Sequence, residues 1–179
     1  MTYNIYRTTN DPYFSPGSIP YDTTSSATYT EPGVIGDPNT NYYYVVTSVE
    51  DATGTESALS ERVGEFDFAL VPGEDTTDYK YNFVALALNV DSIADADSLA
   101  SYVGGVYMVI RYDATTQGIT YWLPDYSSGT NFPAEVGQPY FLYARDTAPT
   151  VVTLVGSVPM KQSTIFSLTP GSGPGESLS

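Results

Sequence analysis

The chain has 179 residues, enough for one large or two small domains. Its 21 acidic and 6 basic residues give a formal net charge of -15 at pH 7, and a field of this sign repels the phosphates of nucleic acids and of anionic lipids. Cysteine and histidine are both missing from the sequence, which excludes disulfides, thiolate nucleophiles, imidazole bases and the commonest zinc ligands. These features predict a protein that is not an enzyme, binds no nucleic acid and inserts into no membrane.

The composition indicates β structure. The sequence holds 17 Tyr, 15 Gly and 13 Pro, and these residues favour short strands separated by frequent turns. Only 15% of the residues are charged, so the solvated surface must be largely Ser, Thr, Asn and Tyr, which suits contacts between subunits or with sugars. We expect an all-β protein of the cell surface or exterior. The first residues show no export signal, so export would need a signal outside this sequence or another route.

Residues 1–65 are predicted to form a first set of strands, at residues 3–7, 27–31 and 41–49. Residues 51–54 predict a hairpin turn, with Gly54 where φ is positive, and residues 57–63 are expected to return as the partner strand. Alternation along residues 41–49 predicts two faces. The inward face would hold Tyr42, Tyr44, Val46 and Ser48, and the outward face Tyr43, Val45 and Thr47.

This set of strands resembles part of a bacterial fibronectin type III domain, namely its strands C, F and G. The matching stretches are Tyr3-Asn4-Ile5-Tyr6-Arg7, Tyr42-Tyr43-Tyr44-Val45-Val46-Thr47-Ser48-Val49 and Asp51-Ala52-Thr53-Gly54-Thr55-Glu56-Ser57-Ala58-Leu59-Ser60. The resemblance implies an immunoglobulin-like sandwich and gives Tyr42 the place of the tyrosine that makes the corner hydrogen bond. It also implies that two strands are missing, because the family's strands A and B precede strand C, and here strand C begins at residue 3.

The missing strands would leave one sheet face without a cover. The residues on that face are Tyr3, Ile5, Tyr44 and Val46. An open sheet face with two free edges is unstable and prone to association. We therefore expect other β structure to cover these four residues, which makes them a candidate acceptor face.

Residues 66–80 are expected to be a connecting strand or linker, and residues 81–158 a second β-rich domain. The apolar run at 81–88 predicts a strand that is buried on both faces. Four further strands are predicted at 106–112, 119–123, 139–144 and 150–158, and residues 113–118 predict the hairpin between the first two.

One helix is predicted, at residues 92–103. Ser92 would be its N-cap, with Asp95 three residues later as in a capping box. The apolar face would hold Ile93, Ala96, Leu99 and Ala100. Gly104 and Gly105 are expected to end the helix.

The order of strand, short helix and meander resembles a small β domain that follows fibronectin-like modules in secreted bacterial proteins. The matching motifs are Tyr81-Asn82-Phe83-Val84, Arg111-Tyr112-Asp113 and Gly137-Gln138-Pro139-Tyr140-Phe141. This resemblance implies no activity.

Residues 159–179 repeat an earlier motif, because Phe68-Ala69-Leu70-Val71-Pro72-Gly73 recurs as Phe166-Ser167-Leu168-Thr169-Pro170-Gly171 before a flexible tail. The second copy predicts a strand without a domain of its own, formed by Thr164, Ile165, Phe166, Ser167, Leu168 and Thr169.

Three explanations of this unpaired strand and of the bare sheet face are open. The chain is an excerpt of a longer modular protein, or its second domain covers the bare sheet, or this donor strand crosses to a neighbouring subunit and completes its sheet. Repeated head to tail, the last contact builds a filament.

Clustered carboxylates are the remaining source of acid–base or metal chemistry. The clusters are Glu50, Asp51 and Glu56, then Glu74, Asp75 and Asp78, then Asp91, Asp95 and Asp97. Carboxylate pairs serve glycosidases, and carboxylate oxygens bind Ca²⁺. Turns and helix starts also favour Asp and Glu for backbone reasons. We expect the backbone role, no cofactor and at most a weak Ca²⁺ site.

Trp122, Tyr121 and Tyr126 form a second candidate site, a stacking platform for sugars. Alternation with Thr120 also fits Trp122 as a core residue, which we favour. Taken together, the sequence predicts an extracellular structural subunit that joins copies of itself head to tail by β-strand exchange. The alternative is a carbohydrate-binding or accessory module of a secreted enzyme or adhesin, with a polysaccharide as its partner.

Overall fold

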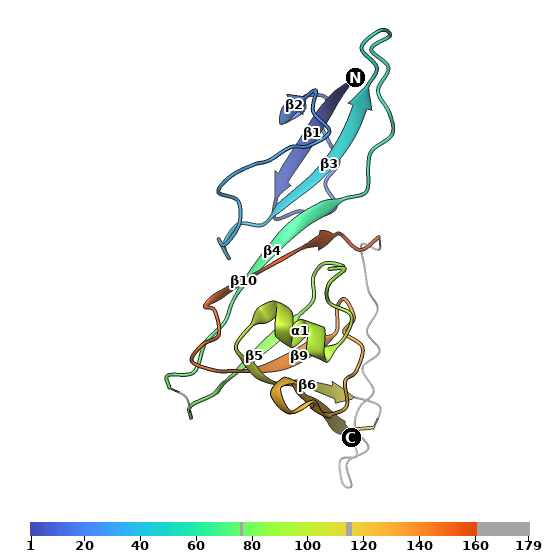
Figure 1. Ribbon diagram of the computed structural model, residues 1–179. Helices are drawn as coiled ribbons and strands as arrows, with labels where there is room; N and C mark the ends of the chain where they lie inside the picture. The colour runs from blue at the N-terminus through green and yellow to red at the C-terminus, as the bar shows by residue number, and fades with distance from the viewer. Residues whose placement is uncertain (76, 114–115, 161–179) are drawn as a thin grey trace, which may run out of the picture. The chain divides into compact units, whose positions relative to one another are not determined.

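A computed structural model describes residues 1–75, 77–113 and 116–160 and confirms the all-β class (Figure 1). It contains two antiparallel five-stranded sheets and one short α-helix. The predicted donor strand at 164–169 lies outside the described residues. No helix of the described chain is long and apolar enough to cross a membrane. The elements are β1 (Thr2–Thr9), β2 (Asp22–Thr24), β3 (Tyr42–Val49), β4 (Val63–Ala69), β5 (Lys80–Ala85), α1 (Ala96–Val103), β6 (Val106–Asp113), β7 (Gly118–Leu123), the 3-10 turn η1 (Pro124–Tyr126), β8 (Ser128–Gly129), β9 (Pro139–Ala144) and β10 (Val151–Ser157).

The described chain divides into two compact units, each built on its own sheet. The first comprises Met1–Leu70, Leu86–Ile93 and residues 149–160, and the second comprises Val71–Ala85 and Ala94–Ala148. This division differs from the predicted domains 1–65 and 81–158, because β10 returns to the first sheet, where it pairs with β4 over its whole length.

The first sheet has the strand order β10-β4-β3-β1-β2. β1 and β3 pair along eight residues each, whereas β4 meets β3 only at Tyr43 and Tyr44. The rest of β3 borders residues 57–60. There the predicted partner strand is irregular, because the backbone N–H groups of Val46 and Ser48 donate to the hydroxyls of Ser60 and Ser57. The hairpin turn at 51–54 is confirmed, with Gly54 at φ 70°.

The predicted inward face of β3 is wrong by one residue. The buried side chains are Tyr43, Val45 and Thr47, and the four residues predicted to face inward, Tyr42, Tyr44, Val46 and Ser48, are only half-buried. Both alternating sets consist of aromatic, β-branched or hydroxyl side chains, so alternation alone could not tell which set faces the core.

The candidate acceptor face is partly covered by its own chain, because Ile5 is buried whereas Tyr3, Tyr44 and Val46 are half-buried. The register places Ile5 opposite Val46, and Ile5 is 2% exposed. Glu31 lies over this face, where it pairs with Arg7 and accepts a hydrogen bond of 2.9 Å from the Tyr44 hydroxyl. The predicted strand at 27–31 is therefore absent, and β2 at 22–24 is the strand that pairs with β1.

The second sheet has the strand order β5-β9-β6-β7-β8, with α1 on one face (Figure 1). The strands predicted at 106–112, 119–123 and 139–144 are confirmed. The core lies on the helix side of the sheet. Its fully buried members include Leu99, Val109, Phe132, Tyr140 and Leu142.

The helix begins three residues later than predicted. Asp95 is its N-cap, and the Asp95 carboxylate accepts from the Ser98 backbone N–H at 2.9 Å. The Ser98 hydroxyl in turn accepts from the Asp95 N–H, which completes the capping box. Ser92 is not a cap because a turn forms before the helix, where the Ile93 N–H donates to the Val90 carbonyl. Gly104, at φ 77°, ends the helix as predicted.

Candidate functional site

The face of the second sheet that turns away from α1 carries a row of apolar side chains across four strands. Phe83 of β5 lies opposite Phe141 of β9, Phe141 lies opposite Ile110 of β6, and Ile110 lies opposite Tyr121 of β7. Because directly opposite residues point to the same side of a sheet, these four side chains form one line. Phe83 is 67% exposed and Phe141 38%.

A second row runs beside the first. Tyr81 of β5 lies opposite Tyr143 of β9, and their rings stack at 4.3 Å between centroids. A register shift between Val106 and Met108 inserts one residue into β6. Such a bulge re-aims side chains, and it places the Tyr107 ring 6.1 Å from the Tyr143 ring. The bulge therefore adds a tyrosine to a face that regular alternation would not give it.

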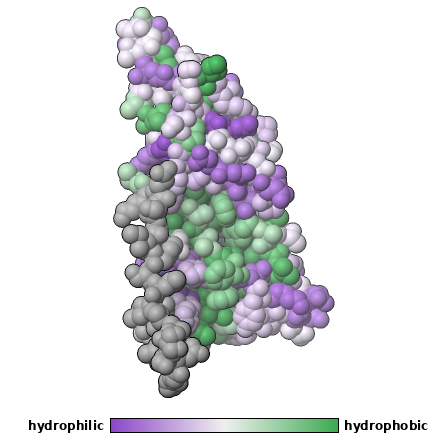
Figure 2. All heavy atoms as spheres, turned by 180° about the vertical axis from the view of Figure 1, so that it is seen from behind, coloured by the Kyte–Doolittle hydropathy of each residue, from purple (hydrophilic) through white to green (hydrophobic). Residues whose placement is uncertain are grey.

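We call this surface the aromatic face. Its residues are Tyr79, Tyr81, Phe83, Tyr107, Met108, Ile110, Tyr112, Ile119, Tyr121, Tyr126, Phe141 and Tyr143. None of them is charged, in a chain with net charge -15. Figure 2, seen from behind Figure 1, shows a group of apolar side chains exposed on that side.

The exposed part of the aromatic face is large. Seven of its members, Tyr81, Phe83, Tyr112, Ile119, Tyr121, Tyr126 and Phe141, are between 38% and 69% exposed. At roughly 150–250 Å² for a large side chain, they leave on the order of 800 Å² of apolar surface in solvent. Monomeric proteins rarely expose a contiguous patch larger than a few hundred Å², so this face has the properties of a contact surface.

The prediction that residues 81–88 form a strand buried on both faces is wrong. Asn82 and Val84 are buried on the helix side, whereas Tyr81 and Phe83 face solvent. One signal in the sequence was available. A single short helix can cover only one face of a five-stranded sheet, so the apolar residues on the other face had no predicted cover.

Two pairs of tyrosine rings on this face stack on one another. Tyr81 and Tyr143 are nearly parallel, with an interplanar angle of 20°, and Tyr79 stacks on Tyr107 at 4.7 Å. Rings that stack side by side along a sheet turn their edges and hydroxyls outward. A sugar platform needs ring faces turned to solvent, whereas outward edges and hydroxyls suit a protein partner.

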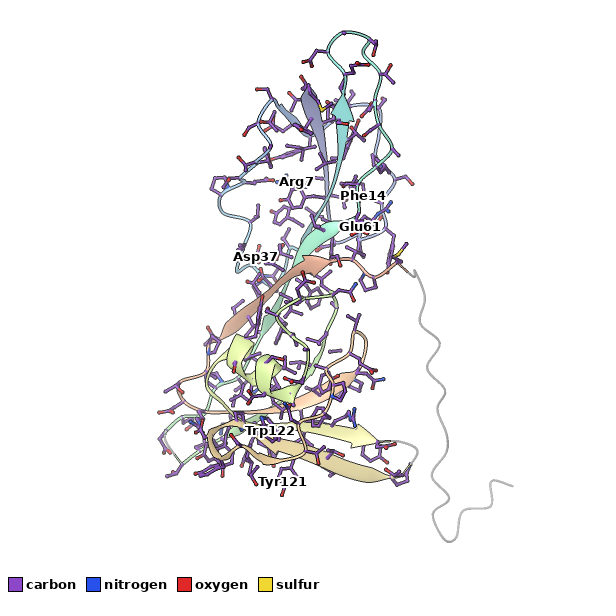
Figure 3. All side chains as sticks on the ribbon, turned by 45° about the vertical axis from the view of Figure 1, so that its right-hand side comes forward. Arg7, Phe14, Asp37, Glu61, Tyr121 and Trp122 are labelled. Carbon is purple, nitrogen blue, oxygen red and sulfur yellow. The ribbon has the colours of Figure 1, made fainter. Side chains whose placement is uncertain are left out.

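The predicted sugar platform is not one surface. Trp122 lies on the α1 side of β7, where its indole N–H donates to Asp97 at 2.8 Å, and Tyr121 points to the opposite side (Figure 3). Tyr126 joins Tyr121 on the aromatic face, through its edge contact with Tyr107. Alternation of side chains along a strand separates Trp122 from Tyr121.

The acidic clusters serve local partners. Glu56 accepts a hydrogen bond of 2.9 Å from the Tyr6 hydroxyl, and Asp95 caps α1. Asp78 pairs with Lys80 at 2.8 Å, and this partner holds the pKa of Asp78 below its usual value. Among residues 1–75, 77–113 and 116–160, no group of three or more acidic side chains lies where it could hold a metal ion.

Sequence reasoning missed a buried acidic pair in β4. Glu65 and Asp67 are 4% and 3% exposed. They fix the segment that leads into β3, because Glu65 accepts from the Tyr42 N–H at 2.6 Å and Asp67 accepts from the Gly36 N–H at 2.7 Å. Burial raises the pKa of Glu65 to about 7. Glu65 falls at the end of the predicted first segment and Asp67 in the predicted connecting strand or linker at 66–80, and no pattern there indicated that either acid is buried.

The first unit also contains an open cleft of about 450 Å³, lined by residues 59–62 and 157–160 with Tyr13 and Asn89. Its charged side chains are Glu61 and Arg62, and Arg62 donates to the Phe14 carbonyl at 3.0 Å. Figure 3 labels Glu61 and Phe14. The lining brings no pair of carboxylates together, so we assign the cleft no chemistry.

Comparisons of the chain with protein-family models, with curated proteins and with solved structures give no match. The aromatic face is therefore interpreted from its own geometry.

Proposed function

We propose that this protein is a structural subunit of a cell-surface or extracellular assembly, and that copies of it associate through the aromatic face. The observation that carries the proposal is the uncharged, exposed apolar surface on the second sheet. Its area, on the order of 800 Å², equals what one partner contributes to a standard protein–protein interface. Aromatic side chains are enriched in such interfaces and charged ones are depleted.

A self-assembly partner fits the charge of the chain. Two copies that each carry -15 repel one another, so their contact must avoid charged surface. The aromatic face offers the required uncharged surface. Its tyrosine hydroxyls supply hydrogen bonds at the edge of an otherwise apolar contact.

Multi-angle light scattering and negative-stain microscopy of the full chain test the proposal. We expect association that rises with protein concentration. Ile119→Asp, at a position 69% exposed on the aromatic face, should abolish it. Ile19→Asp is the matched control, because Ile19 is 83% exposed and belongs to the first unit, which contributes no residue to the aromatic face.

Two outcomes contradict the proposal. One is a wild-type chain that stays monomeric at every concentration, and the other is equal loss of association in the Ile119 and Ile19 variants. Binding of a soluble polysaccharide that disappears with Tyr126→Ala would instead support the sugar-binding alternative. In that case Trp122→Phe should leave the binding unchanged, because Trp122 lies on the other side of the sheet.

A further inference from the structure

We propose that the outer edge of β5 accepts a strand formed by residues 164–169 of a second copy of this chain. This inference rests on the proposed self-assembly and names the contact that joins the subunits. It takes the place of Tyr3, Ile5, Tyr44 and Val46 as the acceptor, because Ile5 is already buried and Glu31 of the same chain lies over part of that face.

Among the described residues, β5 is the one long sheet edge that stays open along its whole length. The two sheets end in four edge strands, of which β2 has three residues and β8 two, too short to align a six-residue strand. β10 has seven residues, and its outer edge is occupied at one end, at Ser157. There the Asn89 N–H donates to the Ser157 carbonyl at 2.9 Å, and the Ser157 N–H donates to the Asn89 carbonyl at 3.0 Å.

The outer edge of β5 has no such partner. In the described chain, β5 forms backbone-to-backbone hydrogen bonds with β9 alone, and its Lys80 carbonyl also accepts from the Asn82 side chain at 3.2 Å. Asn82 contacts the backbone of Val71 through its side chain, on the helix side of the sheet. Natural edge strands avoid association by means of charges, prolines or bulges. Between Tyr81 and Ala85 β5 has none of these, and Lys80 at its start is already paired with Asp78.

The sequence of residues 164–169 is suited to this edge. In an extended strand, Phe166 and Leu168 point to one side, and Ile165 to the other. Phe166 and Leu168 would continue the aromatic face beside Tyr81 and Phe83. The first two residues of the earlier copy of this motif lie in a paired strand, since Phe68 and Ala69 end β4 opposite Val152 and Val151 of β10.

Charge favours the same occupant. Residues 161–179 contain one lysine, Lys161, and one glutamate, Glu176, so their side chains sum to zero while the chain as a whole carries -15. A neutral segment approaches an acidic unit without the repulsion that two acidic surfaces experience.

A second copy explains more of the surface than the chain's own end would. A strand added beside β5 extends the sheet but does not cover the aromatic face, which leaves on the order of 800 Å² exposed. The body of the neighbour that donates the strand can cover that area. Since each copy offers one donor and one acceptor, the contact is head to tail and forms an open chain of subunits unless it closes into a ring.

Disulfide trapping tests the inference in the full chain, which contains no native cysteine. Phe166→Cys protein is mixed under mild oxidation with Tyr81→Cys, Phe83→Cys or Ala85→Cys protein, three alternate positions that cover shifts of the register. The control partner is Val155→Cys, on the other long edge strand and 53% exposed. We expect at least tenfold more mixed disulfide dimer with one of the β5 variants than with the control.

The outcomes separate this inference from the proposed function. If the wild-type chain associates through Ile119 but no β5 position cross-links above the control, the strand contact is refuted and the self-assembly proposal stands. If the wild-type chain never associates, both fail. The double variant Phe83→Cys with Phe166→Cys should give linked multimers, and a monomer with an internal disulfide would refute the role of a second copy.

Discussion

Phe83 and Phe141 lie directly opposite one another on neighbouring strands, with ring centroids 5.1 Å apart and ring planes tilted by 57°. Their rings are nevertheless 67% and 38% exposed. A cross-strand aromatic pair contributes roughly 0.2–1 kcal/mol to stability, whereas fully burying one such ring contributes roughly 1.5–3 kcal/mol. About half of the apolar burial that this pair could provide is unused in a single copy and is available to a partner.

This relationship predicts that exposed and buried phenylalanines of the second unit differ in their effect on stability. Phe83→Thr should lower the free energy of unfolding by less than about 1 kcal/mol, because only the cross-strand contact is lost. Phe132→Ala, at a position 1% exposed, should cost about 3–5 kcal/mol. Urea unfolding followed by Trp122 fluorescence measures both, and equal losses would show that Phe83 has a structural role.

The buried acid of β4 predicts a stability that falls as the pH rises. Glu65 has a folded-state pKa of about 7, against an ordinary value of 4.5. The folded chain therefore holds a proton that the unfolded chain releases at lower pH. This contribution is complete below about pH 4.5 and is lost progressively up to about pH 7, on the order of 3 kcal/mol in total.

Glu65→Gln removes this titration. The variant keeps an oxygen to accept from the Tyr42 N–H and carries no charge at any pH. We expect it to be more stable than wild type at pH 8 and to show a flatter pH profile between pH 5 and 8, by urea unfolding. A wild-type chain whose stability rises between pH 5 and 8 in parallel with the variant would contradict the assignment.

The corrected helix start makes a separate prediction. Asp95→Ala removes the N-cap acceptor of the Ser98 N–H and should lower the free energy of unfolding by about 0.5–2 kcal/mol. Ser92→Ala should have little effect, since Ser92 lies before the turn that precedes the helix. Chemical unfolding of the two variants checks this, and a larger loss in the Ser92 variant would restore the original helix start.

Local patterns in the sequence predicted most elements of the second sheet. The strand at 139–144 matches β9 at both ends, because alternating aromatic and aliphatic residues end at a turn sequence. The helix was predicted from its apolar face, but its start was misplaced. Ser92 and Asp95 are both good N-cap residues, and only the fold shows that Asp95 has the extended backbone of the N-cap.

Contacts between distant parts of the chain could not be predicted in the same way. β10 joins β4 across more than 80 residues of sequence, as in the pairing of Asp67 with Thr153, and nothing local specifies that partner. The contacts of Glu31 with Arg7 and Tyr44 likewise join residues that are distant in the sequence, and no local pattern specifies them. The candidate site was missed for a related reason, because an apolar strand has the same sequence whether its second face is buried or open.

Hydroxyl-radical footprinting of the full chain at low and high concentration tests the central claim most directly. It reports the solvent exposure of individual aromatic and aliphatic side chains. If copies associate through the aromatic face, Tyr81, Phe83 and Ile119 should become protected at high concentration, while Ile19 and Ile35, exposed in the first unit, keep their reactivity. Unchanged reactivity of Phe83 and Ile119 in a sample that has associated would contradict the account.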